Sequence, residues 1–134
     1  MKDINHKINI ITRLNISFVF FYHGLIPKIL FLDETEVLMI NSHHYPFTIQ
    51  SITLVAGITE ILIACAILIF KKSLIPIYLA MVILLVLSVD ILIVNTNLIT
   101  QAFNPVSTNI MALSLCYLSI LTHNRLHNDN SGSF

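Results

Sequence analysis

The chain has 134 residues, of which 56% are hydrophobic and only 10% are charged, and its mean hydropathy is +0.85. Soluble domains carry about 25% charged residues, so this composition excludes a soluble enzyme and a disordered chain and predicts that most of the chain lies in a lipid bilayer. Seven basic residues are balanced by seven acidic ones, which excludes the excess of positive charge on which nucleic-acid binding depends.

Four apolar segments are long enough to cross a membrane, since a spanning helix needs roughly 20 mostly apolar residues. The first lacks a small-x-small cleavage site and continues too far for a signal peptide. A polar connection of residues 32–50 follows it, a very short turn joins the second and third segments into a tight hairpin, and a polar tail of residues 123–134 is expected to be disordered. The spans run from about residue 11 to 31, 51 to 70, 74 to 94 and 106 to 122. The sequence therefore predicts an all-α fold, a single integral-membrane domain over residues 1–134 built as an antiparallel four-helix bundle.

Basic residues alternate between the two sides of the predicted spans. The connections 32–50 and 95–105 contain no lysine or arginine. Because basic loops remain in the cytoplasm, we predict that both termini and the turn between the second and third spans are cytoplasmic. The basic residues on that side are Lys2, Lys7, Arg13, Lys71, Lys72 and Arg125.

Motifs for metal and nucleotide chemistry are missing from the sequence. The two cysteines, Cys65 and Cys116, have no zinc-site spacing, and three glycines are too few for a phosphate-binding loop. The adjacent histidines His43 and His44 point in different directions and are weak evidence for a metal. We predict no metal site.

Apart from Arg13 at the start of the first span, the charged residues and histidines inside the predicted spans are His23, Lys28, Glu60 and Asp90. A charged side chain at the centre of a membrane helix costs about 2.5–3.5 kcal/mol, so it is usually paired or lines a wet cavity. Lys28 and Asp90 lie at similar depth and have opposite charge, and His23 and Glu60 form a second pair at matching depth. For Lys28 the alternative is that its long side chain reaches the outer headgroups.

Glu60 lies on a face of small residues made by Ala56, Gly57 and Ala64, and small faces allow helices to approach closely. Glu60 is therefore expected to point into the bundle rather than toward lipid. There it is either a structural carboxyl whose hydrogen bonds are satisfied, or a carboxyl that handles protons or binds a ligand.

Two prolines mark changes in the helices. Pro27 removes an amide donor close to Gly24 and predicts an interruption of the first span. Asn104 is expected to cap the fourth helix and Pro105 to occupy its first turn. Asn109, one turn deeper, is free to hydrogen-bond Asp90 or Lys28.

These residues resemble the DoxX-like family of small four-helix bacterial membrane proteins. The resemblance is carried by residues 21–31 (FYHGLIPKILF), residues 57–60 (GITE), Asp90 and residues 102–109 (AFNPVSTN). It implies a multi-pass protein of the bacterial cytoplasmic (inner) membrane, with relatives linked to quinone-dependent oxidation of sulfur compounds. It also marks signature positions: Gly24, Pro27, Lys28, Gly57, Glu60, Asp90, Asn104, Pro105 and Asn109.

The favoured interpretation is a membrane protein that is not catalytic alone, either an accessory subunit or a binder of a small amphipathic ligand such as a quinone. The quinone carbonyls would accept hydrogen bonds from Lys28, His23 or Asn109, beside Glu60. One alternative is the membrane component of a quinone-linked oxidoreductase system that works with a separate dehydrogenase. Another is a small proton-coupled transporter with Glu60 as the carrier. The expected partner is the lipid bilayer; a membrane or peripheral oxidoreductase and a homo-oligomer are left open.

Overall fold

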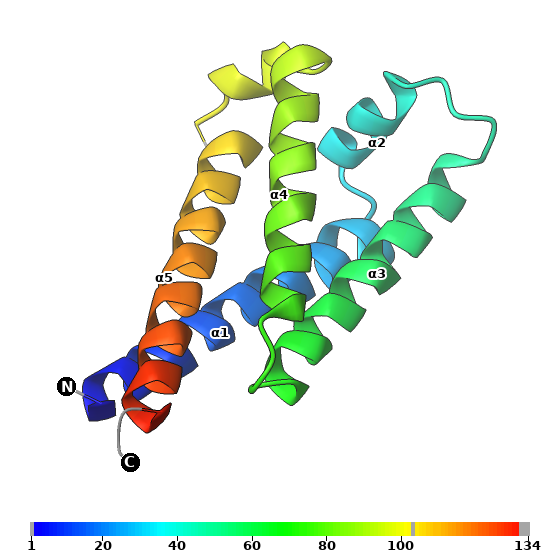
Figure 1. The fold of residues 1–134 in the computed structure, drawn as a ribbon. Helices are drawn as coiled ribbons and strands as arrows, with labels where there is room; N and C mark the ends of the chain where they lie inside the picture. The colour runs from blue at the N-terminus through cyan, green and yellow to red at the C-terminus, as the bar shows by residue number, and fades with distance from the viewer. Residues whose placement is uncertain (1, 103, 132–134) are drawn as a thin grey trace.

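The computed structural model describes residues 2–102 and 104–131, and in this part of the chain all regular structure is helical. Four helices in these residues are long and apolar enough to cross a membrane, at Asp3–Leu30, Ile49–Ile69, Ile75–Ile93 and Pro105–Asn128. The all-α fold and the four apolar helices are confirmed. In chain order the elements are α1 (Lys2–Leu25), the π-helical turn η1 (Ile26–Leu30), α2 (Glu34–Asn41), α3 (Ile49–Ile69), α4 (Ile75–Ile93), the 3₁₀ turn η2 (Thr96–Thr100) and α5 (Pro105–Ser131) (Figure 1).

The ends of α1 and α5 extend beyond the apolar segments that predicted them. The Asn9 side chain donates hydrogen bonds to the Ser119 carbonyl at 2.9 Å and to Thr122 Oγ1 at 3.1 Å. These hydrogen bonds join the polar end of α1 to the polar end of α5. The prediction of a disordered tail is therefore wrong as far as Ser131, and residues 132–134 of that tail lie outside the described residues.

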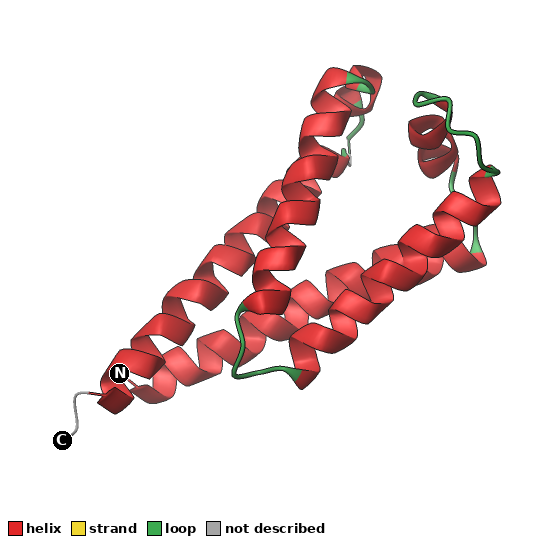
Figure 2. Cartoon of the chain, turned by 45° about the vertical axis from the view of Figure 1, so that its right-hand side comes forward, coloured by secondary structure: helices red, strands yellow, loops and turns green. Residues whose placement is uncertain are grey.

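The four long helices form two pairs, α1 with α3 and α4 with α5, and the pairs diverge from one end of the molecule (Figure 2). α1 packs against α3 and against α5, and α4 packs more extensively on α5 than on α3. The predicted tight hairpin of the second and third spans is thus joined by a short turn, but its helices separate beyond that turn (Figure 2). The apolar core fills the half of the molecule near this turn and includes Ile16, Phe20, Ile63, Ile67, Ile77, Ala80 and Cys116.

α1 and α3 cross in backbone contact at two glycines. A Cβ atom built on Gly24 would lie 2.6 Å from the carbonyl oxygen of Gly57, and one built on Gly57 would lie 2.6 Å from the carbonyl oxygen of Gly24. Only glycine allows this approach. On the same face of α3, Glu60 and Ala64 are buried, so the small-residue face of this helix is its packing face.

Pro27 changes the geometry of the first membrane helix. α1 ends at Leu25, and η1 continues as a π-helical turn in which the Phe31 amide donates to the Ile26 carbonyl at 2.9 Å. The chain then reverses into α2, whose first turn is capped by Asp33 accepting from the Thr35 amide at 2.8 Å. The helix interruption is where Pro27 predicts it, whereas α2 lies inside the connection that was expected to be only polar loop.

The start of α5 has the predicted local chemistry. Asn104 Oδ1 accepts a hydrogen bond from the Ser107 amide at 2.8 Å, and Pro105 is the first helical residue. Phe103, part of the motif that carries the family resemblance, lies outside the described residues.

Candidate functional site

A cavity of about 430 Å³ lies between α1, α3, α4 and α5 and is bordered by α2. Its volume is in the range of small-molecule sites, about 300–1,000 Å³. Residues from all five α-helices and from η1 line it, and we call it the polar cavity. The candidate residues named from the sequence all line it: His23, Lys28, Glu60, Asp90 and Asn109.

Lys28 forms the centre of the charged groups. Its Nζ lies 2.7 Å from Glu60 Oε1 and 3.2 Å from Glu36 Oε1. The Lys28 side chain is 9% exposed and that of Glu60 is 10% exposed, so this is a buried ion pair and the ammonium does not reach for headgroups. The expected pairing of Lys28 with Asp90 is wrong.

The reason lies in the crossing of α1 with α3. Matching depths along straight helices gives the height of each residue but not the face on which it lies. Backbone contact at Gly24 and Gly57, followed by the π-helical turn, places Lys28 directly beside Glu60. α4 packs mainly on α5, which keeps Asp90 on the opposite wall of the polar cavity.

Asp90 pairs instead with a residue just after α2. His43 Nε2 lies 2.8 Å from Asp90 Oδ1, an ion pair when the imidazole is protonated. The neighbouring His44 is exposed and has a φ of 51°, so the two histidines do separate in direction as the sequence suggested. Only His43 lines the polar cavity.

Sequence reasoning missed the contribution of α2 to the polar cavity. The residues that it and its C-terminal turn supply are spaced by three and four positions, a helical period that predicts one shared face. This periodic spacing could have revealed a helix in the connection, but it covers only two turns and follows the acidic residues at the start of a polar segment. The residues are Glu36, Met39, Ile40 and His43.

His23 and Asn109 differ from their expected pairings. His23 is exposed, with its ring against the edge of Tyr22 at a centroid distance of 5.9 Å. Among the described residues none hydrogen-bonds its imidazole, so the pair of His23 with Glu60 is wrong. Asn109 Nδ2 donates to Ser88 Oγ at 3.2 Å, and not to Asp90 or Lys28.

Glu60 Oε2 is buried and has no hydrogen-bond partner among the described residues. A buried carboxylate oxygen without a donor costs about 1–3 kcal/mol or more, so a donor from a ligand, a water or a proton on this oxygen would be stabilising. The cavity holds three carboxyl groups, those of Glu36, Glu60 and Asp90, against one lysine. It is therefore equipped to hold protons and to accept hydrogen bonds.

α2 covers the polar cavity through polar contacts. Glu36 reaches Lys28, His43 reaches Asp90, and Ser42 Oγ donates to Asn95 Oδ1 at 2.7 Å. No residue of α2 itself is fully buried, so these three contacts add to the partial packing of the helix on α3. Within the described chain, no group of three His, Cys, Asp or Glu side chains is arranged to hold a metal ion.

The comparisons with known proteins give one match. A family model described as the DoxX-like family matches residues 17–117, a range that contains both crossing glycines and every candidate residue of the polar cavity. No curated protein and no solved structure matches the chain. The match covers most of the sequence, and the chain therefore belongs to the DoxX-like family and is a membrane protein with several apolar helices.

Proposed function

We propose that this protein binds a small amphipathic ligand of the quinone type in the polar cavity, and that it acts as an accessory or ligand-binding membrane protein rather than as a catalyst on its own. The observation that carries the proposal is the unpartnered Glu60 Oε2, buried beside the Lys28 ammonium in a cavity of ligand size.

The polar cavity combines the two kinds of contact that such a ligand needs. Apolar side chains of α1 and α4, among them Phe20, Ile83 and Leu87, form walls for a ring or an isoprenoid chain. Polar groups lie among them: a ligand carbonyl can accept from Lys28, and a ligand hydroxyl can donate to Glu60 Oε2. A quinone, when bound, exchanges two electrons and two protons, and the three carboxyl groups are suited to hold those protons.

The surroundings of the site are part of the proposal. Residues 1–134 form one domain of the bacterial inner membrane, an antiparallel bundle with both termini in the cytoplasm. The polar cavity and α2 then lie toward the outer face. An oxidoreductase that exchanges electrons with the ligand is a proposed partner, which would make the protein the membrane component of a redox system.

Binding of a quinone analogue tests the proposal directly. The full chain in lipid nanodiscs is titrated with decylubiquinone and with a short-chain menaquinone, and bound ligand is measured by equilibrium dialysis. We expect saturable binding that weakens about tenfold to a hundredfold in Glu60→Gln, because a hydrogen bond to a charged group contributes about 1.5–3 kcal/mol. Glu34→Gln is the matched control, since it removes the same charge from an exposed position that does not line the cavity.

A second variant protects the test against misfolding of Glu60→Gln. Met39→Trp should fill the polar cavity from α2, and it removes neither partner of Lys28. It should abolish binding without loss of helicity. Absence of saturable binding by the unmodified protein, or binding that both variants leave unchanged, would refute the proposed site.

A further inference from the structure

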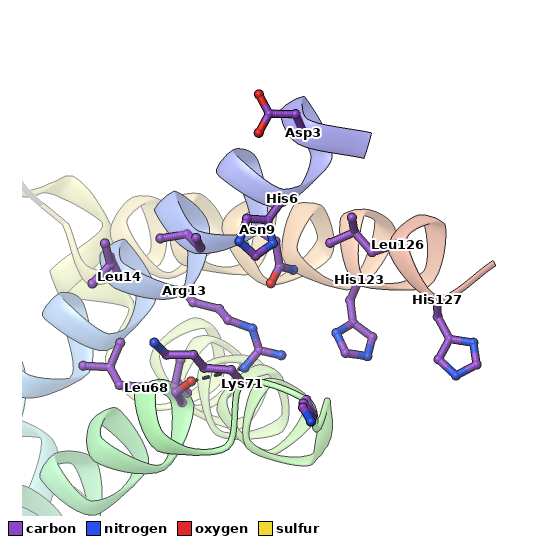
Figure 3. A pocket seen from close by; sticks show the side chains of 13 residues that line it. Asp3, His6, Asn9, Arg13, Leu14, Leu68, Lys71, His123, Leu126 and His127 are labelled. Atoms are coloured by element: carbon purple, nitrogen blue, oxygen red, sulfur yellow. Dashed lines mark hydrogen bonds between the residues drawn. The ribbon is translucent and has the colours of Figure 1, made fainter. Parts of the chain in front are cut away.

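A second cavity, of about 1,250 Å³, lies at the end of the molecule that carries both termini. It is an open hollow bordered by the start of α1, the end of α5, the end of α3 and the turn from α3 to α4, and we call it the terminal cavity (Figure 3). Three residues with a fixed positive charge line it: Arg13, Lys71 and Lys72. It is separate from the polar cavity and shares no lining residue with it.

Arg13 holds the basic turn in position. Its side chain is buried, and Nη1 donates to the Ile67 carbonyl at 3.2 Å and to the Phe70 carbonyl at 3.4 Å, while Nη2 donates to the Ser73 carbonyl at 2.8 Å. Its Nε is buried without a partner among the described residues. Its acceptors are backbone carbonyls at the C-terminal end of α3 and in the turn that follows, so no described carboxylate neutralises the guanidinium beside Lys71.

The positive charge of the terminal cavity is not neutralised by carboxylates in the described part of the chain. No described carboxylate lies within ion-pair distance of Arg13, Lys71 or Lys72. Asp3 is the one acidic lining residue described, and it pairs with Lys7 at 3.0 Å. In Figure 3, Asp3 lies on the far side of α1 from the Arg13 guanidinium.

The remaining lining residues divide into a polar and an apolar part. His123 and His127 project from α5 on the same side of that helix as Arg13 (Figure 3). Ile10, Leu14 and Leu68 line the cavity beside the cations. A cationic rim next to an apolar wall matches a molecule that carries a phosphate on hydrocarbon chains, and basic pockets between membrane helices bind such headgroups.

We infer that the terminal cavity binds an anionic phospholipid, with the phosphate at Lys71, Lys72 and Arg13 and the acyl chains against Ile10, Leu14 and Leu68. Charge complementarity supports this occupant, because three cations that have no carboxylate partner among the described residues line one cavity. The apolar wall favours a lipid over free phosphate. The terminal cavity shares no lining residue with the polar cavity, so this inference does not rest on the proposed function.

Lipid binding can be measured by native mass spectrometry of the full chain released from nonionic detergent. The protein is titrated with short-chain phosphatidylglycerol, with short-chain phosphatidylcholine, and with glycerol 3-phosphate as the free phosphate. We expect phosphatidylglycerol to bind at least tenfold more tightly than phosphatidylcholine, and glycerol 3-phosphate not to compete at equal concentration. Each of Lys71→Gln and Lys72→Gln should weaken phosphatidylglycerol binding about fivefold.

The control removes one cation at another position. Arg125→Gln removes an exposed cation that does not line the terminal cavity, and it should change binding less than twofold, whereas Lys71→Gln/Lys72→Gln should change it more than tenfold. An Arg125→Gln loss equal to that of either single lysine variant would show attraction to a basic surface only and would overturn the site. Equal binding of the two lipids, or full competition by glycerol 3-phosphate, would also overturn it.

Discussion

Replacing Gly57 with alanine tests the crossing on which the polar cavity depends. The added Cβ would lie 2.6 Å from the Gly24 carbonyl oxygen, 2.9 Å from Ile29 Cγ1 and 3.1 Å from Lys28 Cβ. Ordinary van der Waals contact begins at 3.4 Å, and a backbone oxygen cannot rotate away as a side chain can. α1 and α3 must therefore separate locally by about 0.8 Å.

The sign of the change in unfolding free energy shows whether Gly57 lies on an open helix face or in close contact with α1. In an open helix, alanine in place of glycine is stabilising by about 0.5–1 kcal/mol, whereas overpacking a close contact costs about 1–3 kcal/mol. For Gly57→Ala we expect a net loss of about 1–2 kcal/mol in the free energy of unfolding. The distance from Lys28 Nζ to Glu60 Oε1, now 2.7 Å, would lengthen by a similar amount to about 3.5 Å, beyond a good hydrogen bond.

Unfolding by increasing mole fractions of dodecyl sulfate in mixed micelles, followed by circular dichroism, gives this free energy. Ile58→Ala is the control, since the Ile58 side chain is 46% exposed and points away from the crossing. It should change stability by less than about 0.5 kcal/mol. A Gly57→Ala protein as stable as the unmodified chain, or more stable, would show that the two backbones are not in contact.

Three further changes test the ion pairs and the cap. Lys28→Met should cost about 3–5 kcal/mol in the same unfolding assay, because it leaves the Glu60 carboxyl buried and unpaired, and Lys28→Met/Glu60→Gln should recover part of that loss. Asn104→Ala should cost about 1 kcal/mol by removing the cap of α5, and Asn104→Asp should restore it. His43→Leu should remove the donor to Asp90 and increase amide hydrogen exchange in residues 34–45, with α4 and α5 unchanged.

Each of these three has an outcome that contradicts it. Equal losses in the single and double variants of Lys28 would show that the pair is not coupled. An Asn104→Ala loss matched by Asn97→Ala, which alters an exposed amide outside α5, would show that no cap is involved. Unchanged exchange in His43→Leu would mean that α2 is held by other contacts.

Features that depend on neighbouring residues were predictable from the sequence. The apolar segments are long enough to predict four spanning helices because a bilayer imposes its thickness on every span. Pro27 interrupts the first helix and Asn104 caps the last, since each acts on backbone groups a few residues away. The small face around Gly57 was visible for the same reason.

The partners of the charged residues were not predictable. Depth placed Lys28 level with Asp90, but the structure pairs Lys28 with Glu60 and Glu36. The depth of a residue does not say on which face of the helix it lies, and the crossing of α1 with α3 determines which side chains face each other. Glu36 was not a candidate, and His43 was considered only as weak evidence for a metal, because the sequence did not reveal that α2 folds over the polar cavity.

Membrane residence, the number of apolar helices, their interruptions and the family are therefore written in the linear chain, because hydrocarbon and backbone geometry act on short windows of sequence. Only the tertiary structure decided which side chains meet, how α2 covers one cavity, and that Arg13 and the Lys71–Lys72 turn line another. Those outcomes depend on the tilt and rotation of whole helices, which are determined by packing between residues far apart in the chain.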